Sequence, residues 1–65
     1  MITVLEQTPT GLQRDGKPLF RRVYLVCDGN RPLPTDAAPG SLALVRQSGT
    51  VVTKLLFPDG IWETV

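Results

Sequence analysis

The chain has 65 residues, of which seven are Lys or Arg, six are Asp or Glu, one is Cys and none is His. A chain of this length forms one domain at most and buries only roughly 60% of the surface of its unfolded form, so its own core gives marginal stability. A single Cys excludes an internal disulfide and the lack of His argues against a zinc site, which leaves oligomerisation or docking onto a larger body as the expected supplement.

The near balance of charges argues against a dedicated nucleic-acid binder, because such proteins carry a clearly basic face. Basic residues do cluster in the first half of the chain, but acidic residues lie among them. No apolar run approaches the roughly 18–20 residues of a membrane span, and the start of the chain lacks the pattern of a signal peptide. Because the chain begins with Met1, we expect a complete, soluble product made in the cytosol.

The first predicted strand is Ile2–Glu6, which is rich in β-branched residues. Pro9 has no N–H to donate to a neighbouring strand, so this strand must either end there or lie at an edge of the sheet. Asp15-Gly16 then predicts a hairpin turn, because this dipeptide readily adopts the positive φ values of a tight turn.

The longest predicted strand is Leu19–Cys27. Its apolar residues also fit one or two turns of helix, but Pro18 before it and the β-branched residues within it favour a strand. The second half is apolar on both faces, so we expect both faces to be covered, one of them by a neighbouring subunit. Tyr24 either contacts that subunit or closes the edge of the core with its hydroxyl in water, and Cys27 is expected to be a small buried hydrophobe.

The segment 28–40 contains three prolines and predicts an irregular connection. Arg31-Pro32-Leu33-Pro34 is typical of a polyproline-like arm, and the next four residues, Thr35 to Ala38, fit a single helical turn. Two interpretations stay open at this point: a surface crossover that joins two parts of the sheet, or an arm that lies on a neighbouring chain.

The last part of the chain predicts a three-stranded meander, with strands at Ser41–Val45, Thr50–Phe57 and Ile61–Val65. The polar run 46–49 ends in Gly and forms the first turn, and Pro58-Asp59-Gly60 has the composition of a type I turn closed by a Gly bulge. Trp62 is expected to pack across the strand pair onto Phe57 or Leu55, as a core residue or as an anchor at an interface.

Residues for catalysis are not apparent. The carboxylates are spread along the chain, most of them in predicted turns, and neither serine has a nearby base in the sequence. No Gly-rich phosphate loop occurs, and a general acid–base pair needs two groups within hydrogen-bond reach. We therefore expect no enzymatic activity, no cofactor and no metal.

The span 33–65 carries a recognisable series of features: Pro39-Gly40-Ser41, an apolar strand, the turn at Ser48-Gly49, a second strand, Pro58-Asp59-Gly60, and a late Trp62 followed by an apolar end. This series resembles a module of small virion proteins of tailed bacteriophages, found in head-decoration, tail and fibre proteins. It departs from the module at Thr53, where members often have Tyr. The resemblance implies a β-rich, oligomeric, non-catalytic protein.

Together these observations predict an all-β domain over residues 1–65, a small antiparallel sheet or barrel-like sandwich. The predicted function is a structural protein of a bacteriophage virion that binds capsid or tail subunits, forms a homo-oligomer, and is made in the host cytoplasm. The alternative is a free-standing SH3-like or OB-like module that binds a host protein or nucleic acid. The predicted interface residues are Tyr24, Val26, Arg31, Pro32, Leu33, Pro34 and Trp62.

Overall fold

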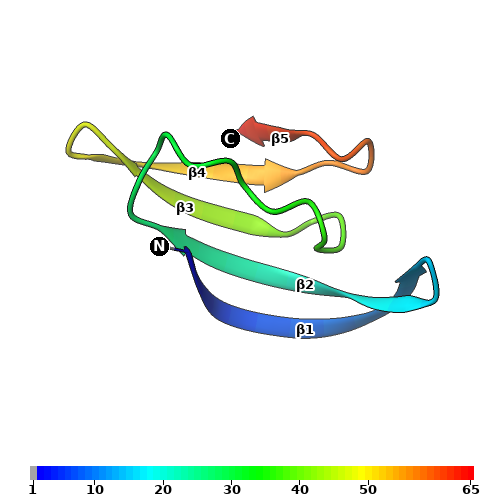
Figure 1. Cartoon of the computed structure of the whole chain (residues 1–65). Coiled ribbons are helices and arrows are strands. Elements are labelled where there is room, and N and C mark those ends of the chain that lie inside the picture. Colours follow the sequence, from blue (N-terminus) through cyan, green and yellow to red (C-terminus); the bar gives the residue numbers. More distant parts are fainter. Residues whose placement is uncertain (1) are drawn as a thin grey trace.

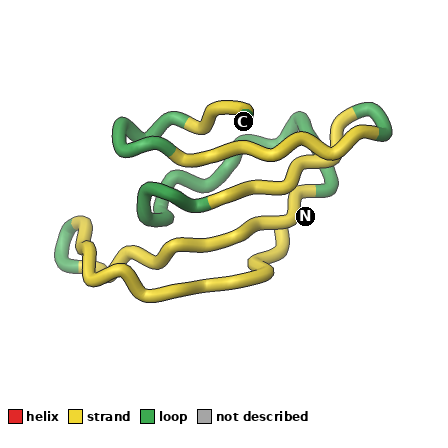
Figure 2. The backbone as a smooth tube through the Cα atoms, turned by 180° about the vertical axis from the view of Figure 1, so that it is seen from behind, coloured by secondary structure: helices red, strands yellow, loops and turns green. Residues whose placement is uncertain are grey.

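The computed structural model describes residues 2–65, which form one five-stranded sheet with the strands in sequence order (Figure 1). The strands are β1 (Ile2–Arg14), β2 (Lys17–Val26), β3 (Leu42–Gln47), β4 (Thr50–Leu56) and β5 (Trp62–Thr64). The all-β class predicted from the sequence is confirmed, and Figure 2 shows only strands and connections along the described chain.

Two of the predicted turns are tight two-residue turns, and the second is shorter than predicted, because β3 continues through Arg46 and Gln47. In the turn between β1 and β2, Asp15 and Gly16 have φ values of 53° and 78°, and in the turn between β3 and β4, Ser48 and Gly49 have values of 49° and 79°. Two successive positive φ values define a type I′ turn, whose twist matches that of the strands it joins. Asp and Ser tolerate this conformation less well than Gly does, but they can bond their own backbone there.

The turn between β4 and β5 is the predicted Pro58-Asp59-Gly60 turn. The Gly60 N–H donates to the Phe57 carbonyl at 2.9 Å, and the Ile61 N–H donates to Asp59 Oδ1 at 3.1 Å. Gly60 has a φ of 84°, the left-handed conformation that the closing position requires. Pro, Asp and Gly therefore each have the role that turn chemistry assigns to them.

The sheet is mixed, which corrects the predicted antiparallel arrangement. β2 and β3 run parallel, with Val23 paired to Leu42 and Val26 paired to Val45, while the other neighbouring strands are antiparallel. The segment 27–41 returns the chain to the starting end of β2 before β3 begins, and this return makes the pair parallel. The sheet stays open, with β1 and β5 at its edges, so the described chain is a single layer of strands rather than a barrel or a sandwich.

β1 is an edge strand of 13 residues and continues through Pro9. The sequence left open whether Pro9 ends the strand or lies at an edge, and the second alternative is correct. The pairing with β2 is interrupted between Val4 and Glu6 and again between Pro9 and Gln13. Such bulges and prolines are the means by which edge strands resist pairing with other chains.

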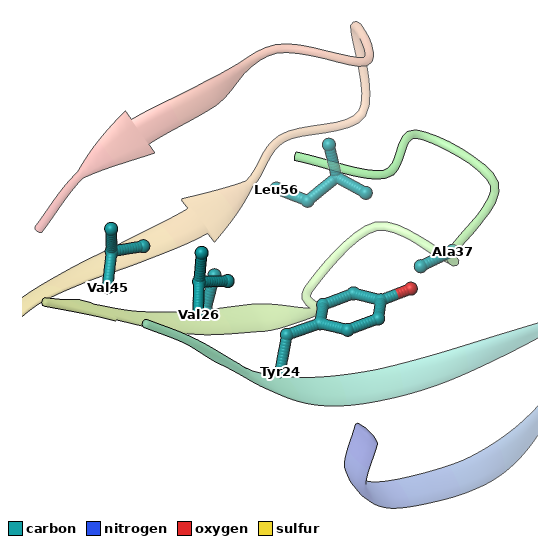
Figure 3. Packing of buried hydrophobic residues seen from close by; sticks show 6 residues of the cluster. Tyr24, Val26, Ala37, Val45 and Leu56 are labelled. Carbon is teal, nitrogen blue, oxygen red and sulfur yellow. The ribbon is translucent and has the colours of Figure 1, made fainter. Parts of the chain in front are cut away.

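The core lies on one face of the sheet, beneath the crossover 27–41 (Figure 3). The buried side chains of this cluster come from β2, β3, β4 and the crossover, and they are Tyr24, Val26, Ala37, Ala43, Val45 and Leu56. Leu33 of the crossover and Trp62 of β5 pack against the cluster. The segment 35–38 crosses this face as bends rather than as the helical turn that its sequence suggested. The crossover therefore serves as the second layer of the molecule.

Candidate protein interface

Arg22 of β2 ties three parts of the chain together on the covered face. Its Nε donates to Gln7 Oε1 of β1 at 3.0 Å, and its Nη1 donates to Tyr24 Oη at 3.3 Å. The same Nη1 lies 3.7 Å from Asp36 Oδ1 of the crossover. The Arg22 guanidinium therefore joins the edge strand, the core and the crossover.

The hydrogen bond to Tyr24 raises the pKa of Arg22 above its ordinary value, and the charge of Asp36 acts in the same direction while burial opposes them. A group whose pKa rises on folding contributes stability below its unfolded pKa and loses it only as the pH rises through the folded value. For an arginine both values lie above the range in which proteins are studied. The titration of Arg22 itself therefore adds no pH dependence to the stability between acidic and mildly basic conditions.

Ser41 fixes the end of the crossover. Its Oγ accepts the Arg22 backbone N–H at 3.0 Å and donates to the Ala38 carbonyl at 2.7 Å, and the side chain is fully buried. Next to it, the Ala38 N–H donates to the Phe20 carbonyl at 2.9 Å. One small hydroxyl thus satisfies a donor of β2 and an acceptor of the crossover, where water has no access.

Trp62 closes the other side of the covered face. Its Nε1–H donates to the Pro34 carbonyl at 2.9 Å, and its ring meets Tyr24 edge-on, with a centroid distance of 6.2 Å and an interplanar angle of 68°. Trp62 pairs with Leu56 across β4 and β5, so it lies on the covered face. This corrects the predicted packing onto Phe57 or Leu55, which would have required the opposite face.

These contacts change the predicted interface. Tyr24 and Val26 lie in the core of their own chain, exposed by only 2% and 0%, and leave no surface for a partner. Their predicted role as partner contacts is therefore corrected. Leu33, Pro34 and Trp62 are partly buried by the contacts that hold the crossover on the sheet. Arg31 and Pro32 are exposed on the crossover.

The opposite face of the sheet carries a different set of side chains. Successive partners across the sheet place Glu6, Val23, Leu42, Leu55 and Glu63 in one row. Because residues two apart on a strand share a face, the next row on that face holds Thr3, Leu25, Leu44 and Thr53. We call the six central residues the open face: Val23, Leu25, Leu42, Leu44, Thr53 and Leu55.

The open face is aliphatic except for Thr53, and none of the residues 2–65 forms a layer over it. Its members lie outside the buried cluster beneath the crossover. Leu25 of this face is 39% exposed, and Val51, two residues before Thr53 on β4, is 63% exposed. A strand that is apolar on both faces is expected to be covered on both. The crossover provides one cover for the second half of β2, and the part of the chain that the structure describes provides no other.

Charged residues surround the open face on four sides. Glu6 on β1 and Glu63 on β5 end the row that contains Val23, one at each edge of the sheet. Arg21 precedes Val23 by two residues on β2, and Arg46 follows Leu44 by two residues on β3. Within residues 2–65 the only ion pair joins Arg22 and Asp36, so these four charges pair with none of the described residues.

A second feature is a polar cleft at the end of the sheet, with a volume of about 420 Å³, between residues 27–30 and 46–49. Cys27 at its edge is exposed, which corrects the expected burial of this thiol. The strand ends at Val26, and the chain leaves the sheet there. No group of three metal-ligating side chains occurs among the described residues.

Gly29 in this cleft allows a close approach between two segments. A Cβ at this position would lie 2.4 Å from Gln47 Cγ and 3.2 Å from the Arg46 carbonyl oxygen. The missing side chain therefore lets the start of the crossover pack on the last residues of β3. This packing shapes the cleft, and it fixes the direction in which the crossover leaves β2.

The fold and the face define a small all-β chain with one layer of mixed strands, covered on one side by its own crossover. Comparison with models of known protein families, with curated proteins and with solved structures finds no match. None of the described residues forms a helix long and apolar enough to cross a membrane.

The sequence analysis predicted partner contacts at Tyr24 and Val26 in the second half of β2, and the structure buries both side chains in the core. The alternation of β2 separates Tyr24 and Val26 from Val23 and Leu25, and it shows that one pair must be inside. The signal that identifies the outer pair is the pairing of β2 with β3, which brings Leu42 and Leu44 beside Val23 and Leu25. This parallel register lies between segments separated by the crossover, and no local pattern reveals it.

Proposed function

We propose that this chain is a non-enzymatic structural protein that joins a larger protein assembly through the open face of its sheet. The observation that carries the proposal is the aliphatic surface around Leu25 and Leu44, which lies opposite the covered core. Burial of apolar surface is the main source of free energy in protein association, and contiguous apolar patches on small proteins mark interaction sites. Covering this face would supply the second half of a core that the chain has only on one side.

The assembly that we propose is the particle of a tailed bacteriophage, where the chain would bind capsid or tail subunits. This part rests on the resemblance of residues 33–65 to small virion modules. The same span contains β3, β4 and β5, and it supplies three of the aliphatic residues of the open face, Leu42, Leu44 and Leu55. The module and the docking surface would then be the same part of the chain.

Mass spectrometry of purified particles tests the location. Peptides of the chain should copurify with the particles in a constant ratio to the major capsid or tail subunit. Peptides found in the lysate but not in the particles would overturn the virion role and favour the alternative, a module that binds a host protein or nucleic acid.

A pair of variants tests the surface. Leu44→Asp places a charge at the centre of the open face and should abolish incorporation, because a desolvated, unpaired carboxylate opposes docking. Leu12→Asp is the matched control, since Leu12 is an exposed leucine, 50% accessible, outside this face. Far-UV circular dichroism should show that both variants fold. Equal incorporation of the two variants would show that the open face is not the docking surface.

A further inference from the structure

The four charges around the open face form a pattern that specifies a partner. The two acidic residues, Glu6 and Glu63, lie at opposite edges of the sheet, four strand spacings apart, which corresponds to about 19 Å. The two arginines lie at opposite ends along the strands. By the register of β2 with β3, Arg21 and Arg46 are six residue steps apart, which corresponds to about 20 Å. The four charges therefore outline a near-square on the open face. Its two edges along the strands are acidic, and its two ends across the strands are basic.

When one copy of this square is rotated by 90° relative to a second copy that faces it, each acidic side lies opposite a basic end. Two copies that pack face to face are related by a two-fold axis that lies in the plane between them. If this axis runs along or across the strands, each acidic side faces an acidic side, and each arginine end faces an arginine end. If the axis runs along a diagonal, the strands of the two copies cross at about 90° and every Glu faces an Arg.

We propose that the occupant of the open face is a second copy of this chain, packed as a crossed, two-fold symmetric sandwich. This inference rests on the proposed function, in which the chain joins a larger assembly through the open face. It deepens that proposal by naming a second copy of this chain as the subunit that covers the open face, so that the chain would enter the assembly as a dimer. Like charges placed opposite each other oppose association, whereas complementary charges fix the relative orientation of two partners. The net charge of +1 adds little repulsion between two copies. Orthogonal packing of two sheets is one of the two common arrangements.

The dimensions of the square set the expected strength. Its projected area of about 400 Å² per copy is below the roughly 800 Å² per partner of a standard interface. A corrugated surface buries more than its projection, but the contact stays in the smaller class of specific interfaces. The dimer should therefore be in exchange with the monomer and depend on protein concentration.

Analytical ultracentrifugation of the wild-type chain, from about 10 μM to about 1 mM, is the first test. The crossed sandwich predicts a monomer–dimer equilibrium that weakens as salt is added, because the facing charges are opposite. A monomer at every concentration would overturn the proposal. A dimer that tightens with salt would overturn it too, because facing charges of like sign are the mark of aligned packing.

Charge exchange is the second test. Glu6→Lys with Glu63→Lys makes the rim wholly basic, and Arg21→Glu with Arg46→Glu makes it wholly acidic. In the crossed arrangement each double variant replaces four attractive contacts by repulsive ones, and each should dimerise at least about tenfold more weakly than wild type. A mixture of the two should form a heterodimer at least as tight as the wild-type dimer, which also shows that both variants fold. Unchanged self-association of the double variants would overturn the crossed geometry.

Cysteine cross-linking reads the orientation directly and depends on neither salt nor charge. In a Cys27→Ser background, Glu63→Cys alone should give no disulfide-linked dimer, because the two Glu63 positions lie apart. A mixture of the Glu63→Cys variant with either Arg46→Cys or Arg21→Cys should give a disulfide-linked dimer. Which of the two arginine positions links to Glu63→Cys depends on which diagonal of the square is the two-fold axis. Efficient linking of Glu63→Cys to itself or to Glu6→Cys would overturn the crossed geometry.

The two proposals fail separately. A chain that stays monomeric in solution but enters particles through the Leu44 surface would overturn the homodimer and leave the virion role standing. A chain that forms the crossed dimer but is absent from particles would overturn the virion role and leave the homodimer standing.

Discussion

At the scale of single residues, the crossover is held by a few polar atoms rather than by a large apolar contact. Arg22, Ser41 and Trp62 each bond the crossover to the sheet, and its buried apolar residues are two alanines, Ala37 and Ala38. An alanine gains little from burial, so the polar contacts decide whether this segment stays in place. Every buried side-chain nitrogen or oxygen among the described residues has a partner, which shows how closely these contacts are matched.

Ser41→Ala should destabilise the chain by about 1–3 kcal/mol, because it leaves the partly buried Arg22 N–H without its acceptor. Urea denaturation followed by far-UV circular dichroism measures the change. Ser48→Gly is the control, since Ser48 is exposed with a φ of 49°, a conformation that Gly adopts freely. Equal stability of Ser41→Ala and wild type would show that the hydroxyl does not hold the crossover.

Trp62→Phe keeps an aromatic ring beside Tyr24 but removes the donor to the Pro34 carbonyl. We expect a loss of about 0.5–1.5 kcal/mol, the usual value of one hydrogen bond. Trp62→Ala removes the ring as well and should lose clearly more. If the two variants were equally unstable, the hydrogen bond rather than the ring contact would supply the stabilisation. Thermal unfolding by circular dichroism measures both.

At the scale of elements, the two type I′ turns and the bulged edge strand fix the register of the sheet. A slip by one residue would exchange the covered and open faces, since side chains alternate along a strand. The turns at Asp15-Gly16 and Ser48-Gly49 prevent this slip, because each accepts one geometry. The interruptions of β1 limit pairing with other chains along its free edge.

Gly16→Ala should destabilise the hairpin of β1 and β2 by about 1–2 kcal/mol, the penalty of a Cβ in the left-handed conformation. The surroundings of Gly16 are open, so this strain is the whole effect. Gly49→Ala, in the equivalent turn with a φ of 79°, should lose a similar amount. Melting temperatures measure both. A loss at one turn only would mean that the other turn relaxes to a different geometry in solution.

At the scale of the whole molecule, the chain has one small core and one uncovered aliphatic face. A domain of this size is marginal when it stands alone, and ligands or subunits that bind only the folded state stabilise it by mass action. The proposed docking through the open face therefore predicts that the stability of the chain depends on its state of association.

The melting temperature of the wild-type chain should rise with protein concentration, by about 3–6 °C for each tenfold increase above the dissociation constant. Leu44→Asp should melt at a temperature independent of concentration, because its association is lost. Leu12→Asp should follow wild type. A wild-type melting temperature that is high and constant across this range would show that the chain is stable without a partner.

Local sequence predicted most of the strands and turns. The run of β-branched and aromatic residues in β2, the two Gly-containing dipeptides and Pro58-Asp59-Gly60 each determine their own conformation, since turn chemistry acts over three or four residues. The length of β1 was underestimated, because whether a strand continues through Pro9 depends on its place at an edge. The burial of Cys27 was predicted wrongly, because the end of a strand is set by where its neighbour ends.

The sequence by itself determined that this is an all-β chain with one domain and too few residues for two covered faces, because composition and alternation are local properties. Only the tertiary structure decided that β2 and β3 run parallel, that the crossover covers the face with Tyr24, and that Leu25 and Leu44 are left outside. The parallel pair depends on the return of the 15-residue connection 27–41 to the starting end of β2, and the choice of covered face depends on the side of the sheet over which this connection passes. That choice depends on distant contacts such as Trp62 with Pro34, and no stretch of sequence contains both partners.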